Sequence, residues 1–79
     1  MTKQWKFKVV KSQRGGQGEW FYYPAAATFE REIGARLYAS QFAASQREAG
    51  VTGTRIVVMS RRQFEGDYGP TNFVAEYKV

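Results

Sequence analysis

Residues 28–50 read TFEREIGARLYASQFAASQREAG, and this alanine- and serine-rich stretch decides the fold. Thr28 is a suitable helix N-cap because its hydroxyl can accept hydrogen bonds from free backbone amides, and Glu30 would complement the helix dipole. Gly50 is a natural C-terminal stop. The stretch therefore predicts one helix from Thr28 to about Ala49, long enough to lie across a small sheet.

The predicted helix carries two stripes of apolar side chains. The first has larger residues at helical spacing, and we assign it to the core: Phe29, Ile33, Leu37 and Ala44. The second is a flank of small residues that allows close approach to a sheet: Ala35, Ala39 and Ala43.

Tyr38 and Phe42 are four residues apart and point away from the larger stripe. Two interpretations stay open. In one, the apolar face is wide and Phe42 completes the core. In the other, the two aromatic residues are exposed and contact a partner or a second copy of the chain. We expect a monomer, with a homodimer through Tyr38 and Phe42 as the alternative.

The chain before the helix predicts a β-hairpin. Apolar and basic residues alternate from Gln4 to Lys11, which places Trp5, Phe7 and Val9 on one face and Lys6, Lys8 and Val10 on the other. The polar, glycine-bearing segment 12–18 predicts a loop. The aromatic segment 19–23 (EWFYY) predicts a second strand, contacted on both faces, that Pro24 ends.

The chain after the helix predicts a second hairpin. Residues 54–60 (TRIVVMS) are strand-like, 61–70 (RRQFEGDYGP) are turn-rich, and 71–79 alternate with Phe73 and Tyr77 on one face. The predicted fold class is therefore α+β, in the order strand-strand-helix-strand-strand, with one long helix packed on one face of an antiparallel sheet. We expect a single small domain over residues 1–79. The pattern leaves the strand order open.

The composition argues against catalysis. The 79 residues include no His and no Cys, so the usual acid–base group and thiolate metal ligands are missing. The few acidic residues are scattered, and we expect neither enzyme activity nor a cofactor or metal. The sequence contains no run of about 20 apolar residues, so we expect no membrane span. The N-terminus lacks the features of a signal peptide, and a cytoplasmic location is therefore expected.

Basic residues outnumber acidic ones by 12 to 7, for a net charge of +5, which favours acidic partners. Lys6 and Lys8 share the strand face opposite Trp5 and Phe7, and Arg55 is expected to face the same way, exposed on an open sheet face. The aromatic residues of segment 19–23 could stack nucleic-acid bases beside these cations. The alternative is a solvated edge that discourages aggregation of sheets.

The order of elements resembles the small phage and prophage anti-CRISPR proteins that act on type I effector complexes. The similar features are a basic first strand at residues 5–11 (WKFKVVK), a glycine-bearing loop, an Ala/Ser-rich helix, and the segments 53–57 (GTRIV) and 73–78 (FVAEYK). The resemblance implies a phage- or prophage-encoded inhibitor that binds the backbone subunit of the Cascade complex in the bacterial host and blocks target-DNA binding. It also implies contact of the inhibited complex with non-specific DNA.

Two functions therefore stay open. The first is inhibition of a type I Cascade complex, and the second is direct nucleic-acid binding by the open sheet face. For either one, we expect the partner to contact exposed cations and aromatic anchors: Lys6, Lys8, Arg14, Arg36, Arg47, Arg55, Tyr22, Tyr38 and Tyr77.

Overall fold

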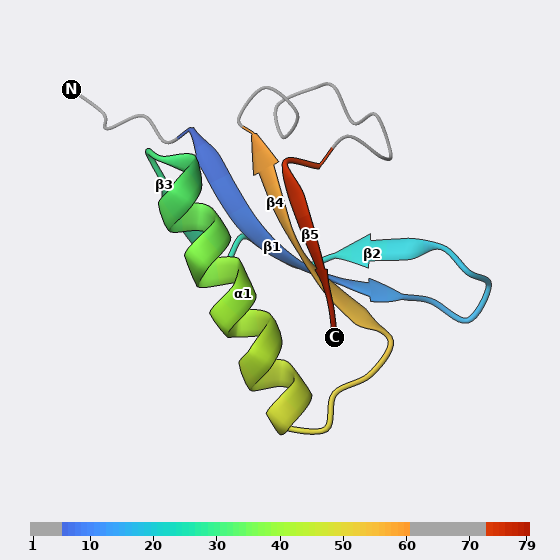
Figure 1. The fold of residues 1–79 in the computed structure, drawn as a ribbon. Helices are drawn as coiled ribbons and strands as arrows, with labels where there is room; N and C mark the ends of the chain where they lie inside the picture. The colour runs from blue at the N-terminus through green and yellow to red at the C-terminus, as the bar shows by residue number, and fades with distance from the viewer. Residues whose placement is uncertain (1–5, 61–72) are drawn as a thin grey trace.

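A computed structural model of the chain describes residues 6–60 and 73–79. Trp5, the predicted turn-rich segment 61–70, and residues 71–72 of the predicted last strand lie outside the described residues. The elements are β1 (Phe7–Arg14), β2 (Trp20–Tyr22), β3 (Ala27–Phe29), α1 (Glu32–Glu48), β4 (Thr54–Ser60) and β5 (Ala75–Lys78). The antiparallel sheet has the order β2-β1-β4-β5, with β3 also beside β1, and α1 lies along one face (Figure 1). This confirms the predicted α+β class and supplies the strand order.

The first strand extends three residues beyond its predicted end at Lys11. Ser12, Gln13 and Arg14 belong to β1 and pair with β2 on one side, so the prediction of a loop from Ser12 is wrong. Ser12 is fully buried, and its hydroxyl donates a 3.0 Å hydrogen bond to the carbonyl of Phe21. This bond explains how a polar residue stays inside the sheet.

β1 pairs with β4 along one edge and with both β2 and β3 along its other edge. The pairing along this second edge is interrupted at Pro24. Ser12 pairs with Tyr22 and Val9 pairs with Ala27, so three steps along β1 match five steps along its partner. Proline lacks the N–H group that donates to a neighbouring strand, so the chain between Tyr22 and Ala27 bulges away from regular pairing with β1. Pro24 thus ends β2 as predicted, but a further short strand follows.

The start of the helix differs from the sequence prediction. Thr28 is in β3, where it pairs with Lys8, and α1 begins at Glu32 after Arg31, whose side chain makes no capping bond. Pairing with β1 keeps the backbone of Thr28 extended, which overrides its local capping preference. The predicted N-cap is therefore wrong.

The end of the helix was predicted correctly. Gly50 has φ of +80°, its amide donates to the carbonyl of Arg47, and the amide of Val51 donates to the carbonyl of Gln46. This pair of bonds is the Schellman arrangement, in which a left-handed residue follows the last turn of the helix.

The face of α1 that packs on the sheet is the small-residue stripe. Ala35, Ala39 and Ala43 are fully buried, whereas Ile33 and Leu37 are 77% and 59% exposed. Ile33 and Leu37 are each two residues from a buried alanine, a rotation of roughly 200° around a helix of 3.6 residues per turn. The assignment of Ile33 and Leu37 to the core is wrong, because the small side chains allow the helix backbone to approach the sheet.

The main core lies between α1 and the sheet. The three buried alanines pack with Val9, Ile56 and Val58, and Phe29 and Phe42 are partly buried against them. The Tyr38 ring centre is 5.4 Å from that of Phe29 and 6.1 Å from that of Phe42. Phe42 therefore completes the core, as in the first of the two interpretations.

A second, smaller cluster lies on the sheet face opposite α1. Val10, Val57 and Met59 are buried there, with Ala25 and Phe73 packed against them. This face is therefore not open along its whole length, contrary to expectation. Phe73 also lies on the face opposite to Tyr77, because the regular alternation of β5 begins only at Ala75.

Candidate functional site

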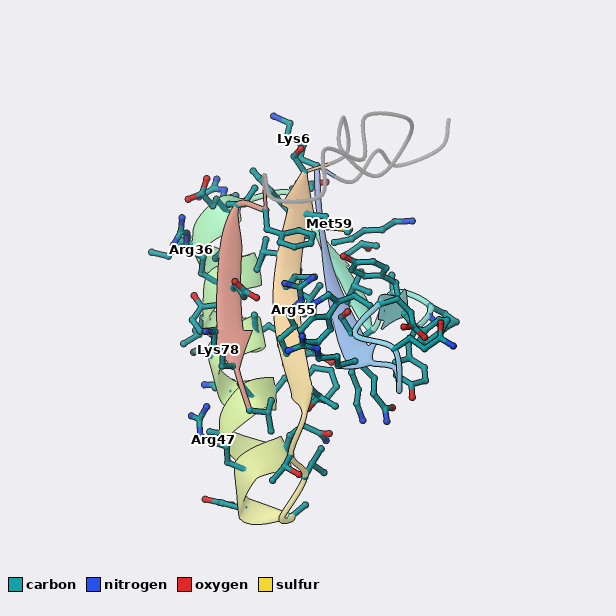
Figure 2. All side chains as sticks on the ribbon, turned by 90° about the vertical axis from the view of Figure 1, so that its right-hand side faces the viewer. Lys6, Arg36, Arg47, Arg55, Met59 and Lys78 are labelled. Atoms are coloured by element: carbon teal, nitrogen blue, oxygen red, sulfur yellow. The ribbon has the colours of Figure 1, made fainter. Side chains whose placement is uncertain are left out.

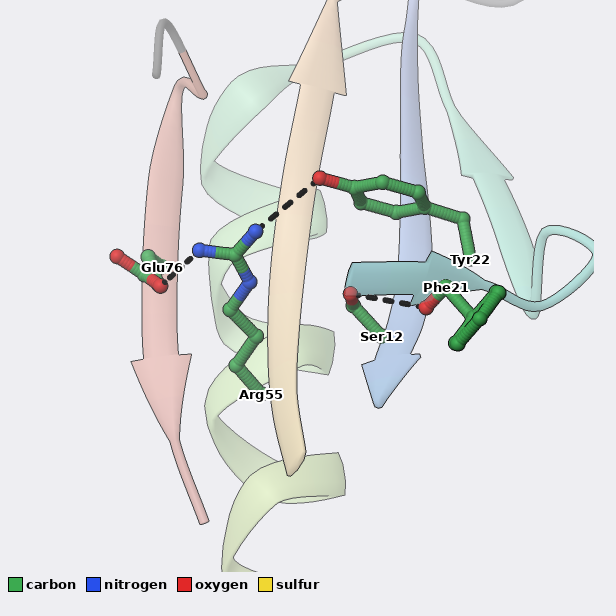
Figure 3. Close-up of polar contacts among 5 residues, drawn as sticks. All are labelled: Ser12, Phe21, Tyr22, Arg55 and Glu76. Atoms are coloured by element: carbon green, nitrogen blue, oxygen red, sulfur yellow. Dashed lines mark hydrogen bonds and ion pairs between the residues drawn. The ribbon is translucent and has the colours of Figure 1, made fainter. Parts of the chain in front are cut away.

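The most elaborate polar arrangement surrounds Arg55 on the face opposite α1 (Figure 3). The guanidinium lies 4.0 Å from the ring centre of Trp20 and 4.9 Å from that of Phe73. One guanidinium nitrogen donates to the carboxylate of Glu76 at 2.8 Å, and another donates to the hydroxyl of Tyr22 at 3.1 Å. Arg55 thus joins side chains from β2, β4 and β5.

Arg55 faces opposite Ile56 and Val58 as predicted, but its side chain is only 11% exposed. The expectation of a freely exposed cation is wrong. Its Nε is buried without a hydrogen-bond partner among the described residues. Planar guanidinium groups stack well on aromatic rings, so Arg55 holds the aromatic residues around it in position.

A pocket of about 260 Å³ adjoins this group. It lies where β1 and β5 end and where β2 and β4 begin. Its lining residues are Arg14, Trp20, Gly53, Thr54, Arg55, Glu76, Lys78 and Val79. We use the name basic corner for the residues Arg14, Trp20, Tyr22, Arg55 and Lys78.

The two helix arginines among the predicted partner residues make contacts inside the molecule. Arg36 donates to the Glu32 carboxylate at 2.8 Å and to the backbone carbonyl of Val74 at 3.0 Å. The hydrogen bond with Glu32 is the main reason that the pKa of Arg36 is raised. Arg47 donates to the backbone carbonyl of Lys78 at 2.9 Å. Figure 2 shows both arginines on α1, near the strand that carries Lys78.

These two arginines occupy acceptors at a sheet edge. In an antiparallel ladder, alternate residues turn their N–H and C=O groups away from the partner strand. Val79 donates its amide to Thr54 of β4, so the neighbouring Lys78 presents its carbonyl outward, where Arg47 binds it. Covering an edge in this way discourages pairing with other chains. Arg36 and Arg47 thus bind acceptors of the same chain at the edge of the sheet.

The structure brings together only some of the predicted site residues. Arg14, Tyr22 and Arg55 lie at the basic corner, whereas Lys6 is exposed before the start of β1 and Lys8 lies toward that same end of the strand. Tyr38 lies on α1, and Tyr77 packs against the main core from β5. Their roles in partner binding stay predictions.

Sequence reasoning missed two residues of the basic corner, Trp20 and Lys78. Trp20 belongs to the aromatic segment 19–23, which was expected to stack nucleic-acid bases, so the same argument could have named it. Lys78 is opposite Arg55 in the ladder between β4 and β5. Only this register, which the pattern did not give, places it beside Arg14 and Trp20.

The chemistry of the basic corner suits binding. Guanidinium, ammonium, indole and phenol groups can hold anions and stack on planar rings. Within residues 6–60 and 73–79, no group of three His, Cys, Asp or Glu residues could hold a metal ion. No helix in these ranges is long and apolar enough to cross a membrane.

Comparison with protein-family models, curated proteins and solved structures found no match for this chain. We therefore infer its function from the geometry of the basic corner.

Proposed function

We propose that the chain is a binding protein that holds single-stranded nucleic acid at the basic corner. The observation that carries the proposal is the meeting of Arg14 and Lys78 with Trp20, which Arg55 anchors. Neither Arg14 nor Lys78 forms an ion pair with another described residue. Proteins that bind single strands combine cations for the phosphates with aromatic rings for the bases.

The Tyr22 ring of the basic corner is accessible. Tyr22 is exposed, and its hydroxyl is held by Arg55 at the edge of the pocket. A ring fixed by a hydrogen bond loses little conformational entropy when a base stacks on it. The phosphate next to that base would meet Arg14 and Lys78. Shape and charge thus favour a single strand, whose bases are free to stack on Tyr22, more than a duplex.

The test is fluorescence anisotropy with a labelled oligothymidylate of about ten nucleotides. If one phosphate contacts Arg14 and Lys78, the logarithm of the affinity should fall with the logarithm of salt concentration with a slope of about −0.7. The double variant Arg14→Gln/Lys78→Gln should lose most of this slope, and Lys6→Gln should keep it. Absence of binding by the unmodified protein at low salt would refute the proposal.

A matched pair of variants tests the stacking. Tyr22 and Phe21 are neighbours on β2, both exposed, and they face opposite sides of the strand. Tyr22→Ala should weaken binding by roughly 5- to 150-fold, which corresponds to stacking of one base. Phe21→Ala should change it much less. Equal losses in the two variants would place the bases elsewhere.

A second candidate, inhibition of a type I Cascade complex through protein contact, is favoured by the exposure of Ile33 and Leu37. These two side chains lie one turn apart on the side of α1 that faces away from the sheet, and an apolar patch of this kind suits a protein partner. The resemblance to anti-CRISPR proteins names the class of partner. Because Arg36 and Arg47 already bind β5, the apolar pair and not these cations would make the contact.

Co-purification with type I effector complexes, followed by a target-DNA shift assay, tests this candidate. Ile33→Glu/Leu37→Glu should abolish association with Cascade and restore DNA binding by the complex. Arg14→Gln/Lys78→Gln serves as the matched comparison and should leave association intact. If the unmodified protein neither binds Cascade nor alters its DNA binding, this candidate is eliminated.

A further inference from the structure

We propose that the pocket of the basic corner is a site for one terminal phosphate group, at the end of a nucleic-acid strand or on a free mononucleotide. For the strand, this inference rests on the proposed function and adds a preference for a phosphorylated end. Three observations carry it: the charges around the pocket, the unpartnered Nε of Arg55 and the place of the pocket at the end of the sheet.

The charges around the pocket favour an anion. Arg14, Arg55 and Lys78 line it together with a single acidic side chain, Glu76. That carboxylate already accepts a hydrogen bond from Arg55 at 2.8 Å. The two remaining cations have no acidic partner among the described residues, so an anionic ligand is the group that would neutralise them.

The wall of the pocket contains a polar atom without a partner. The side chain of Arg55 is only 11% exposed and lies on the face opposite α1, where it contacts Trp20 and Glu76. Its Nε is buried and has no hydrogen-bond partner in the described part of the chain. Buried polar groups are normally satisfied, and a phosphate oxygen that reaches the Arg55 guanidinium would accept a hydrogen bond from this nitrogen.

The position of the pocket favours the end of a strand over its middle. It lies at one limit of the sheet, where four strands begin or end, with Trp20 as an aromatic wall. A strand whose phosphate occupies this pocket extends over the sheet in one direction only, toward Tyr22. The base next to the phosphate then meets the aromatic residues of β2.

The experiment compares three oligothymidylates of the same length: one with hydroxyl groups at both ends, one with a 5′-phosphate and one with a 3′-phosphate. We expect one phosphorylated form to bind about tenfold more tightly than the hydroxyl form, as charge-assisted hydrogen bonds imply. If all three bind equally, the phosphate site is refuted while the proposed function stands.

Two variants localise the preference. Arg14→Gln removes an exposed cation of the pocket that has no acidic partner among the described residues, so it should abolish most of the preference while leaving the melting temperature nearly unchanged. Lys78→Gln should also reduce the preference. Lys6→Gln, which changes an exposed lysine remote from the pocket, should retain it. A preference that survives in both pocket variants would overturn the assignment.

Thymidine monophosphate distinguishes a strand end from a free nucleotide. If no oligonucleotide binds, the proposed function fails. An NMR titration with thymidine monophosphate then tests separately whether the pocket binds a phosphate group. Shifts confined to the backbone amides of Thr54, Arg55 and Lys78 would support a mononucleotide site. Absence of any shift at millimolar nucleotide would refute it.

Discussion

The guanidinium of Arg55 lies 4.0 Å from the ring centre of Trp20, so a cation of β4 stacks on an aromatic residue of β2 across the intervening strand β1. A largely buried arginine with a bound carboxylate and two aromatic neighbours is a rigid element. It sets the geometry of the basic corner before any ligand arrives, which lowers the entropic cost of binding.

Replacement of Arg55 should destabilise the fold. Arg55→Ala removes the bonds to Glu76 and Tyr22 as well as the contact with Trp20, and we expect a loss of about 2–3 kcal/mol in the free energy of unfolding. In a domain of this size the melting temperature should fall by roughly 8 °C or more. Lys6→Ala, at an exposed site, is the control and should melt within a few degrees of the unmodified protein. Equal melting temperatures for the two variants would mean that Arg55 contributes nothing to the fold.

Substitutions on the buried side of α1 should destabilise the fold much more than substitutions on its exposed side. Ala39→Leu introduces a large side chain where the helix meets the sheet, so it should lower the free energy of unfolding by about 1–3 kcal/mol or more. Ile33→Lys changes a side chain that is largely exposed, and its effect should stay within about 0.5 kcal/mol. Urea unfolding measures both. The reverse order would return Ile33 to the core.

The glycine that ends α1 should not tolerate a side chain. Gly50→Ala forces a Cβ into the left-handed region, at a cost of about 1–2 kcal/mol. Gly16 is the control, because an added Cβ meets no atom within 4 Å and its φ lies outside that region. Gly16→Ala should be neutral or stabilising by less than about 1 kcal/mol. Thermal unfolding of both variants checks the difference, and an unaffected Gly50→Ala protein would contradict it.

Loss of the Arg47 contact should loosen the edge strand β5 locally. Arg47→Met removes the donor to the carbonyl of Lys78, and the amide of Val79, which donates to Thr54, should exchange with solvent roughly 2- to 12-fold faster. The amide of Tyr23, at the opposite edge of the sheet, provides the internal control and should keep its exchange rate. Unchanged exchange at Val79 would mean that the contact does not stabilise β5.

The elements of the fold were largely predictable because they depend on local signals. Alternation placed Val9 and Val10 on opposite faces, Gly50 marked the end of the helix, and Pro24 interrupted the second strand. The face of α1 was not predictable from hydrophobicity alone. The stripes of Ile33 and Ala35 are both apolar, and only contact with the sheet selects the smaller one.

The sequence by itself determined the α+β class, the direction in which Arg55 points and the positive charge that favours an acidic partner, because periodicity and composition need no knowledge of distant neighbours. Only the tertiary structure decided which cations are free. Arg36 and Arg47 bind carbonyls 38 and 31 residues away. Arg55 is enclosed by residues from other strands, whereas Arg14 and Lys78 meet at one pocket. These contacts depend on strand order and register, which join segments far apart in the chain and leave no local signal in the sequence.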